Sequence, residues 1–196
     1  MCFYSKLSQD ALKIANRFKA QFIDAEEYNA AEMINGFSFP KTPIVKDKFR
    51  DKIQLCSWGL VPSFAKDLEI RKYTLNARIE TIDSVRSFKD YTTSRCLVIA
   101  DGFYEWKREV VNGKEFKIRH LITCENESLF AFAGLYCNDT YTILTTEANE
   151  LMSEIHNTKK RMPIILSQSD EEKWLNGADY RNFAYPYQVH LKAKAV

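Results

Sequence analysis

The amino-acid sequence predicts an α+β fold that is mainly antiparallel, with a barrel-like curved β-sheet and peripheral helices. Between residues 53 and 145, six short runs are rich in β-branched and aromatic residues and are separated by turns. Helical periodicity occurs only before and after this region, and strands and helices do not alternate regularly. No linker-like composition interrupts residues 1–196, so we predict one domain.

The first elements are expected to be a short extended segment and one helix. Residues 2–5 favour extended backbone, and Ser8 is a good N-cap for the helix that follows. The apolar residues that recur on one face of this helix are Ala11, Ala15, Phe18 and Phe22. Residues 34–45 are not helical and should form loop and edge-strand pieces, because they contain Gly36, Pro40 and Pro43.

Strand structure dominates the middle of the chain. The predicted strands are residues 53–58, 96–100, 103–107, 117–122, 129–135 and 141–145. Asn112 and Gly113 lie between two of these strands and both tolerate positive φ, which favours a type I′ hairpin turn. Helices return at about residues 147–155, and from the N-cap Ser169 to about residue 176.

Composition places the chain among ordinary globular proteins. Hydrophobic residues make up 45% and charged residues 28% of the sequence. The first twenty residues carry several charges and no uninterrupted apolar run, so we expect a cytoplasmic protein with no signal peptide and no membrane span. The formal net charge of +2 does not by itself indicate a nucleic-acid partner.

The five cysteines are unevenly spaced and include no Cys-x-x-Cys pair. With three histidines as the other soft ligands, they predict neither a metal site nor a disulfide framework. Four of them lie inside apolar runs and are expected to be small buried side chains, namely Cys56, Cys96, Cys124 and Cys137. Cys2 differs by its position, because it becomes the first residue once Met1 is removed.

Three polar residues lie in apolar or aromatic surroundings: Asn76, Glu105 and His156. Taken singly, each has an ordinary structural explanation. Asn76 suits a turn cap, Glu105 the solvent side of an alternating strand, and His156 the C-terminal end of a helix. Their occurrence together with a cysteine at position 2 favours a functional explanation.

Several blocks of sequence carry a family resemblance. They are Met1-Cys2 and the runs WGLVPSFAKD (58–67), NARIET (76–81), RCLVIADGFYEW (95–106), FAGL (132–135), TTEAN (145–149), IH (155–156) and RMPIIL (161–166). In this order and approximate spacing, the sequence resembles the SOS-response-associated peptidase (SRAP) family, whose members form covalent links to abasic sites. The resemblance implies the SRAP fold and a role in the DNA damage response.

The resemblance implies that Cys2 is the crosslinking residue, and its chemistry explains why it is placed at the start of a chain. An α-amino group has a pKa of roughly 8, so a neutral fraction is available to attack the aldehyde of a ring-opened abasic site. The neighbouring thiol then closes a five-membered thiazolidine. An internal cysteine lacks the amine, because its nitrogen is part of an amide.

The same resemblance assigns roles to the three polar residues. Glu105 is expected to act as the acid and base that opens the sugar and moves protons during imine formation. Asn76 would orient the amine or the sugar, and His156 would carry out a second proton transfer or stabilise the opened sugar. No cofactor and no metal are implied.

The expected partner is single-stranded DNA that contains abasic sites, bound by a monomer that associates with the nucleoid. Arg78 and Arg161 resemble phosphate contacts, and Phe64 could stack on a base or pack in the core. The loop of Phe39 and Pro40 resembles a wall beside the active site, although Phe39 equally suits core packing. Relatives commonly begin with Cys-Gly-Arg, whereas this chain has a tyrosine at position 4, so one basic contact is missing or is supplied from elsewhere.

Two other functions remain open from the residues alone. Cys2 could be the N-terminal nucleophile of a cysteine peptidase that removes Met1 by autoproteolysis, with His156 or its own amine as the base. Alternatively, the protein could bind nucleic acid through a basic groove without chemistry, in which case changing Cys2 would leave binding intact.

Overall fold

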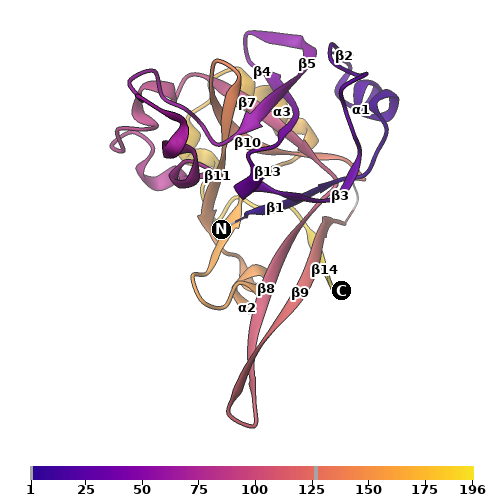
Figure 1. Ribbon diagram of the computed structural model, residues 1–196, viewed down its shortest axis with the longest axis vertical. Helices are drawn as coiled ribbons and strands as arrows, with labels where there is room; N and C mark the ends of the chain where they lie inside the picture. Colours follow the sequence, from indigo (N-terminus) through magenta and orange to yellow (C-terminus); the bar gives the residue numbers. More distant parts are fainter. Residues whose placement is uncertain (1, 126–127) are drawn as a thin grey trace.

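The computed structural model describes residues 2–125 and 128–196, and over these residues the chain forms two β-sheets (Figure 1). The smaller sheet is antiparallel throughout. Its strands follow the order β14 (Leu191–Ala195), β9 (Lys114–Cys124), β8 (Gly102–Val111), β1 (Tyr4–Leu7) and β3 (Ala31–Asn35). The start of the chain therefore lies in the interior of this sheet, between β8 and β3.

The larger sheet is strongly curved. Its order is β12 (Arg161–Pro163), β11 (Thr140–Glu147), β10 (Phe130–Cys137), β7 (Arg95–Ala100), β4 (Lys41–Lys46), β5 (Phe49–Trp58) and β2 (Gln21–Phe22). Two short strands add to it, β13 (Ile165–Leu166) on β10 and β6 (Asn76–Arg78) on β11. A parallel pairing between β5 and β11 closes the strands from β5 through β4, β7 and β10 to β11 into a ring.

The ring has two apolar faces because its strands alternate. On β7, Cys96 and Val98 belong to one buried cluster, which also contains Cys2, whereas Leu97 and Ile99 belong to the other. Burial on both faces explains why β7 and β10 are continuous apolar runs rather than alternating ones. The predicted α+β fold with a mainly antiparallel, barrel-like sheet is confirmed.

Three helices pack at the periphery of the described chain: α1 (Ala11–Phe18), α2 (Glu150–Ile155) and α3 (Gln168–Leu175). Short 3-10 turns occur at Gly36–Ser38, Leu68–Tyr73, Ile79–Thr81, Lys89–Tyr91 and Tyr180–Phe183. None of the helices over the described residues is long and apolar enough to cross a membrane.

The helix boundaries differ from the prediction. The N-cap of α1 is Asp10 rather than Ser8, because the Asp10 carboxylate accepts from the Lys13 N–H while the Ser8 hydroxyl binds Asp101. The N-cap of α3 is Ser167 rather than Ser169.

Residues 34–45 supply an edge strand only at Ile34 and Asn35, which end β3 at the edge of the smaller sheet. β4 is an interior strand of the ring, paired with both β5 and β7. Pro43 is tolerated there because pairing with β7 begins only at Ile44, so the missing N–H of Pro43 removes no bond to that neighbour.

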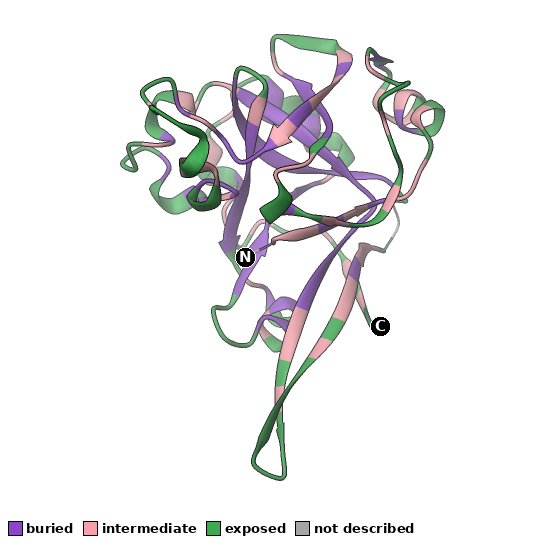
Figure 2. Cartoon of the chain, viewed as in Figure 1, coloured by how far each residue is buried: buried purple, intermediate pink, exposed green. Residues whose placement is uncertain are grey.

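The hairpin of β8 and β9 extends beyond the body of the molecule (Figure 1). Asn112 and Gly113 form its turn with φ of 51° and 77°, as the type I′ prediction requires. Burial decreases along the hairpin from its base to its tip (Figure 2), and β1 pairs with β8 only at its base, over Gly102–Tyr104.

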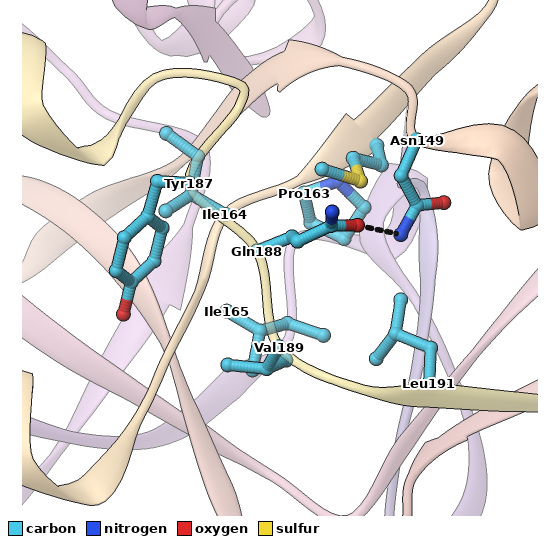
Figure 3. A pocket seen from close by; sticks show the side chains of 9 residues that line it. Asn149, Pro163, Ile164, Ile165, Tyr187, Gln188, Val189 and Leu191 are labelled. Carbon is cyan, nitrogen blue, oxygen red and sulfur yellow. Dashed lines mark hydrogen bonds between the residues drawn. The ribbon is translucent and has the colours of Figure 1, made fainter.

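The C-terminal segment, of which the sequence indicated little, supports α2. Asn149, the N-cap of α2, donates its side-chain amide to Gln188 Oε1 over 2.9 Å (Figure 3). A cavity of about 10 Å³ beside this contact is lined mainly by apolar residues and holds at most about one water molecule. This brace fixes the start of the helix whose other end carries His156.

Candidate active site

Asn76 and Cys2 are joined directly although 74 positions separate them in the sequence. The Asn76 side-chain amide donates to the Cys2 backbone carbonyl over 2.8 Å. Asn76 is the first residue of β6 and pairs with Ile143 of β11, which anchors Asn76 to the ring. Its Oδ1 atom is buried and has no hydrogen-bond partner among the described residues, so it remains available to a donor from a ligand.

Cys2 is fully buried and belongs to the apolar cluster inside the ring. Its thiol lies 3.7 Å from the Tyr4 carbonyl oxygen and donates to it. Burial raises the pKa of the Cys2 thiol well above its ordinary value, and the charge of Glu105 raises it further. The side chain is therefore a neutral thiol at neutral pH, close enough to Glu105 for the two groups to interact electrostatically.

Glu105 is a buried carboxyl on β8, with 5% of its surface exposed. The pairing of β1 with β8 begins at Tyr4 and Tyr104, and Glu105 is the next residue of β8, so the carboxyl borders the first residues of the chain. Burial raises the pKa of Glu105 to about 7. The carboxyl thus exists in both protonation states near neutral pH, which suits a group that donates and accepts protons.

His156 caps the C-terminal end of α2 and is also buried. Its Nδ1 atom lies 2.8 Å from the Arg161 carbonyl oxygen, so Nδ1 carries the proton and donates. Burial lowers the pKa of His156, which favours the neutral ring with Nε2 as an acceptor. The ring can therefore accept a proton at Nε2.

A groove of about 340 Å³ joins Glu105 and His156. It runs along the edge of β8 that β1 leaves unpaired. Its other lining residues are Tyr4, Trp106, Arg108, Lys117 and Thr158. The structure therefore brings the predicted Glu105 and His156 to one groove, while Asn76 binds Cys2 in the adjoining core.

Arg161 is placed differently from a surface phosphate contact. Its guanidinium is 8% exposed and makes a bidentate pair with Glu80, with both N···O distances 2.9 Å, and it also donates to the Thr145 carbonyl. Burial raises the pKa of Glu80, but the hydrogen bonds and the charge of Arg161, together with hydrogen bonds from the Glu80 backbone and from Thr146, outweigh burial, so the net pKa is lowered. A phosphate at Arg161 would compete with this ion pair, and the predicted contact remains a prediction.

The other predicted DNA contacts lie at the surface. Arg78 is exposed at the end of β6, and Phe64 is 38% exposed with the Arg86 guanidinium 4.4 Å above its ring. Phe39 has a positive φ of 53° and is half-buried, with its ring 5.6 Å from the Arg71 guanidinium. Pro40 follows it and accepts from the Trp58 N–H through its carbonyl. Phe64 and Phe39 therefore each lie against an arginine, and their predicted contacts with DNA remain predictions.

All five cysteines are free thiols; Cys56, Cys96 and Cys137 are buried as expected, whereas Cys124 is half-buried. Among the described residues, no group of three or more His, Cys, Asp or Glu side chains is arranged to hold a metal ion.

Sequence patterns did not indicate the residues that complete the groove. Asn157 donates to the Arg108 carbonyl over 2.7 Å and accepts from the Arg108 N–H, and so ties the loop after α2 to the open edge of β8. Lys117 reaches the groove because it lies directly opposite Arg108 in the hairpin. The predicted type I′ turn at Asn112 and Gly113 was the one sequence signal for this pairing, because the turn fixes the register of β8 and β9.

The ring-shaped sheet and the groove define an α+β protein with a candidate thiol nucleophile near its start, beside a buried acid. The chain belongs to the SOS response associated peptidase (SRAP) family, whose model matches residues 1–196.

Similar proteins agree with this assignment. Abasic site processing protein YoqW of Bacillus subtilis (strain 168) is 42% identical over 143 residues, covering 68% of this chain and 61% of that protein. Abasic site processing protein HMCES of Gallus gallus is 35% identical over 152 residues, covering 62% of this chain and 44% of that protein. A crystal structure of a protein from Bacteroides thetaiotaomicron has a TM-score of 0.88 and 33% identity over 100% of this chain and 92% of that one. The chain thus spans about three fifths of the Bacillus relative's length and less than half of the Gallus one's.

Proposed function

We propose that this protein captures abasic sites in single-stranded DNA as a covalent thiazolidine adduct at Cys2. The observation that carries the proposal is the hydrogen bond from Asn76 to the Cys2 carbonyl, which holds the first residues beside a carboxyl whose pKa is raised to about 7. The names of the relatives support the substrate class.

The reaction requires removal of Met1, because only then is the Cys2 nitrogen an amine rather than an amide. The neutral amine adds to the aldehyde carbon of the ring-opened sugar, and loss of one water molecule gives an imine. The thiol sulfur then adds to the imine carbon while its proton passes to the nitrogen. A C–N and a C–S bond are formed, one water is released and no redox step occurs.

Glu105 supplies the protons for this sequence. As the acid it protonates the ring oxygen of the closed sugar. The resulting carboxylate takes a proton from the nitrogen that has added to the aldehyde, gives it to the departing hydroxyl of the carbinolamine, and finally takes the proton from the thiol. A pKa near 7 makes both states accessible. His156, neutral and with Nε2 as acceptor, can take a proton from the sugar hydroxyl at the other side of the groove.

Asn76 acts as a positioning residue toward Cys2. Its amide fixes the carbonyl and hence the rotation of the first residue, while its buried Oδ1 is suited to accept from the Cys2 amine or a sugar hydroxyl. Arg78 and Phe64, both exposed, are suited to a phosphate and a base of the bound strand.

The test is an adduct assay with protein whose intact mass shows that Met1 is absent. Incubation with an abasic single-stranded oligonucleotide should give an adduct that survives denaturation. Cys2→Ala should give none. Cys2→Ser keeps the amine but not the thiol, and should give only an imine that is trapped by borohydride.

Cys137→Ala is the matched control, because Cys137 is a buried thiol of the opposite apolar cluster and its loss should leave adduct formation unchanged. Wild-type protein without any adduct would refute the proposal. In that case, cleavage of peptides that depends on Cys2 would favour the N-terminal nucleophile peptidase instead.

A further inference from the structure

The groove beside Glu105 continues along the β8–β9 hairpin as a strip of aromatic and cationic side chains. Antiparallel register places Arg108 opposite Lys117 and Trp106 opposite Arg119. Because side chains alternate between the faces of a strand, these four residues share one face of the hairpin. Tyr4 joins that face through β1, and its ring meets that of Trp106 edge-on at 4.9 Å.

Charge on this face favours an anion. Arg108, Lys117 and Arg119 are all exposed there. The acidic side chain that contacts them is Glu115, whose carboxylate lies 3.1 Å from Arg108. Lys107 and Glu109 pair with each other on the opposite face and leave this balance unchanged. The Arg108–Glu115 pair is about half exposed on both sides, so it is worth little and a phosphate can replace the carboxylate.

The geometry also holds the cations in place relative to the reacting groups. Arg108 and Lys117 line the same groove as Glu105 and His156, together with the hydroxyl-bearing Thr158. Asn157, which lies between His156 and Thr158 in the sequence, fixes the Arg108 backbone with two hydrogen bonds. Glu105 alternates onto the other face of β8, but it lines the same groove as Arg108 and Lys117. A strand whose sugar lies at Glu105 therefore meets these two cations within that groove.

We propose that Arg108 and Lys117 form a phosphate-binding subsite for the nucleotides that flank the captured sugar, so that the single strand leaves the active site along the β8–β9 hairpin. The ligand is the phosphodiester backbone of a nucleic acid strand. Tyr4 and Trp106 provide the aromatic surface beside it. The subsite rests on the proposed function and specifies the path of the strand.

Noncovalent binding separates this subsite from the crosslinking chemistry. The probe is a single-stranded oligonucleotide with a tetrahydrofuran residue, which mimics the abasic sugar but has no aldehyde. The double variant Arg108→Gln/Lys117→Gln should bind it at least about fivefold more weakly. The slope of log K against log salt should shrink by about 1.4, since each phosphate contact to a single strand contributes about 0.7.

The charge-matched control is Lys48→Gln/Lys52→Gln on the β4–β5 hairpin, which lies at the opposite end of the molecule (Figure 1). It should leave affinity and salt slope at the wild-type values. Glu115→Gln should tighten binding, because it releases Arg108. Equal losses in both double variants, or an unchanged affinity in Arg108→Gln/Lys117→Gln, would overturn the subsite.

Oligonucleotides with single methylphosphonate linkages locate the contact. One linkage next to the abasic analogue should weaken wild-type binding but not that of Arg108→Gln/Lys117→Gln. The adduct assay with aldehyde-bearing DNA is scored separately. If no adduct forms but Arg108→Gln/Lys117→Gln weakens binding as expected, the crosslinking proposal is refuted and the subsite stands. If an adduct forms but the double variant binds like wild type, the subsite is refuted and the crosslinking proposal stands.

Discussion

The Asn76 side-chain amide holds the Cys2 carbonyl at 2.8 Å, and this bond joins the start of the chain to a strand of the ring. Since Asn76 lies on β6, the position of the proposed nucleophile depends on the ring rather than on β1 alone.

Replacement of Asn76 by aspartate should slow adduct formation by about tenfold or more. The substitution keeps the shape but places an acceptor against the Cys2 carbonyl, so one hydrogen bond worth about 1 kcal/mol is exchanged for repulsion. Single-turnover adduct rates, with thermal unfolding as the check on folding, measure the effect. An Asn76→Asp protein that reacts at the wild-type rate would show that Cys2 is positioned by other contacts.

Adduct formation should pass through a maximum with pH. Below about 7 the Glu105 carboxyl is protonated and can donate, whereas above it the carboxylate prevails. The Cys2 amine, with an ordinary pKa of roughly 8, becomes nucleophilic in the opposite direction. Rates measured from about pH 5.5 to about pH 9 should therefore rise and then fall.

Glu105→Gln should be slower and should lose the decline on the alkaline side. A wild-type rate that only rises with pH and then levels off would contradict an acid role for Glu105.

The burial of Glu105 should also cost stability at high pH. Its pKa is raised from an ordinary value of 4.5 to about 7, so the folded protein binds this proton more tightly than the unfolded chain. The free energy of unfolding should fall as pH rises from about 4.5 to about 7 and then stay level, by up to about 3 kcal/mol at about 1.4 kcal/mol per pKa unit.

Denaturant titrations at about pH 4 and about pH 8 measure this difference. Glu105→Gln should gain stability relative to wild type at the higher pH, and Glu172→Gln, on the exposed side of α3, should not. The same pH dependence in wild type and Glu105→Gln would place its origin elsewhere.

Glu80→Gln should destabilise the fold by about 1–3 kcal/mol, because it leaves the buried Arg161 guanidinium without its counter-charge. The partial exposure of Glu80 keeps the effect toward the lower end of what a fully buried pair would cost. Arg161→Lys should also destabilise, since lysine cannot make the bidentate contact. Chemical denaturation compares these variants with Glu69→Gln, which breaks an exposed pair with Lys72 and should change little. An Arg161→Lys protein of wild-type stability but weakened DNA binding would instead support the phosphate contact.

The sequence predicted the local elements well. β5, β7, β8, β9 and β11 each contain the predicted run, and β10 begins one residue after its predicted start. The Asn112-Gly113 turn follows from residue types alone. β4 was misjudged because proline usually indicates an edge, and only the register with β7 shows that Pro43 lies outside that pairing.

The candidate residues were found, but their contacts were not. The partners of Asn76 and Arg161 are 74 and 81 positions away, and no local period connects such residues. Alternation alone would put Glu105 on the solvent side of its strand, whereas the structure buries the carboxyl and raises its pKa to about 7. Arg108 and Lys117 had no motif of their own and gained meaning from the hairpin register.

The burial of Cys2 has a consequence for chemical longevity. Peroxides and alkylating agents attack exposed thiolates, and Cys2 offers neither exposure nor an accessible thiolate. Selectivity is therefore determined by access to the Cys2 thiol rather than by the intrinsic reactivity of its sulfur. A reagent in solution meets a buried, protonated thiol, which slows its oxidation and alkylation.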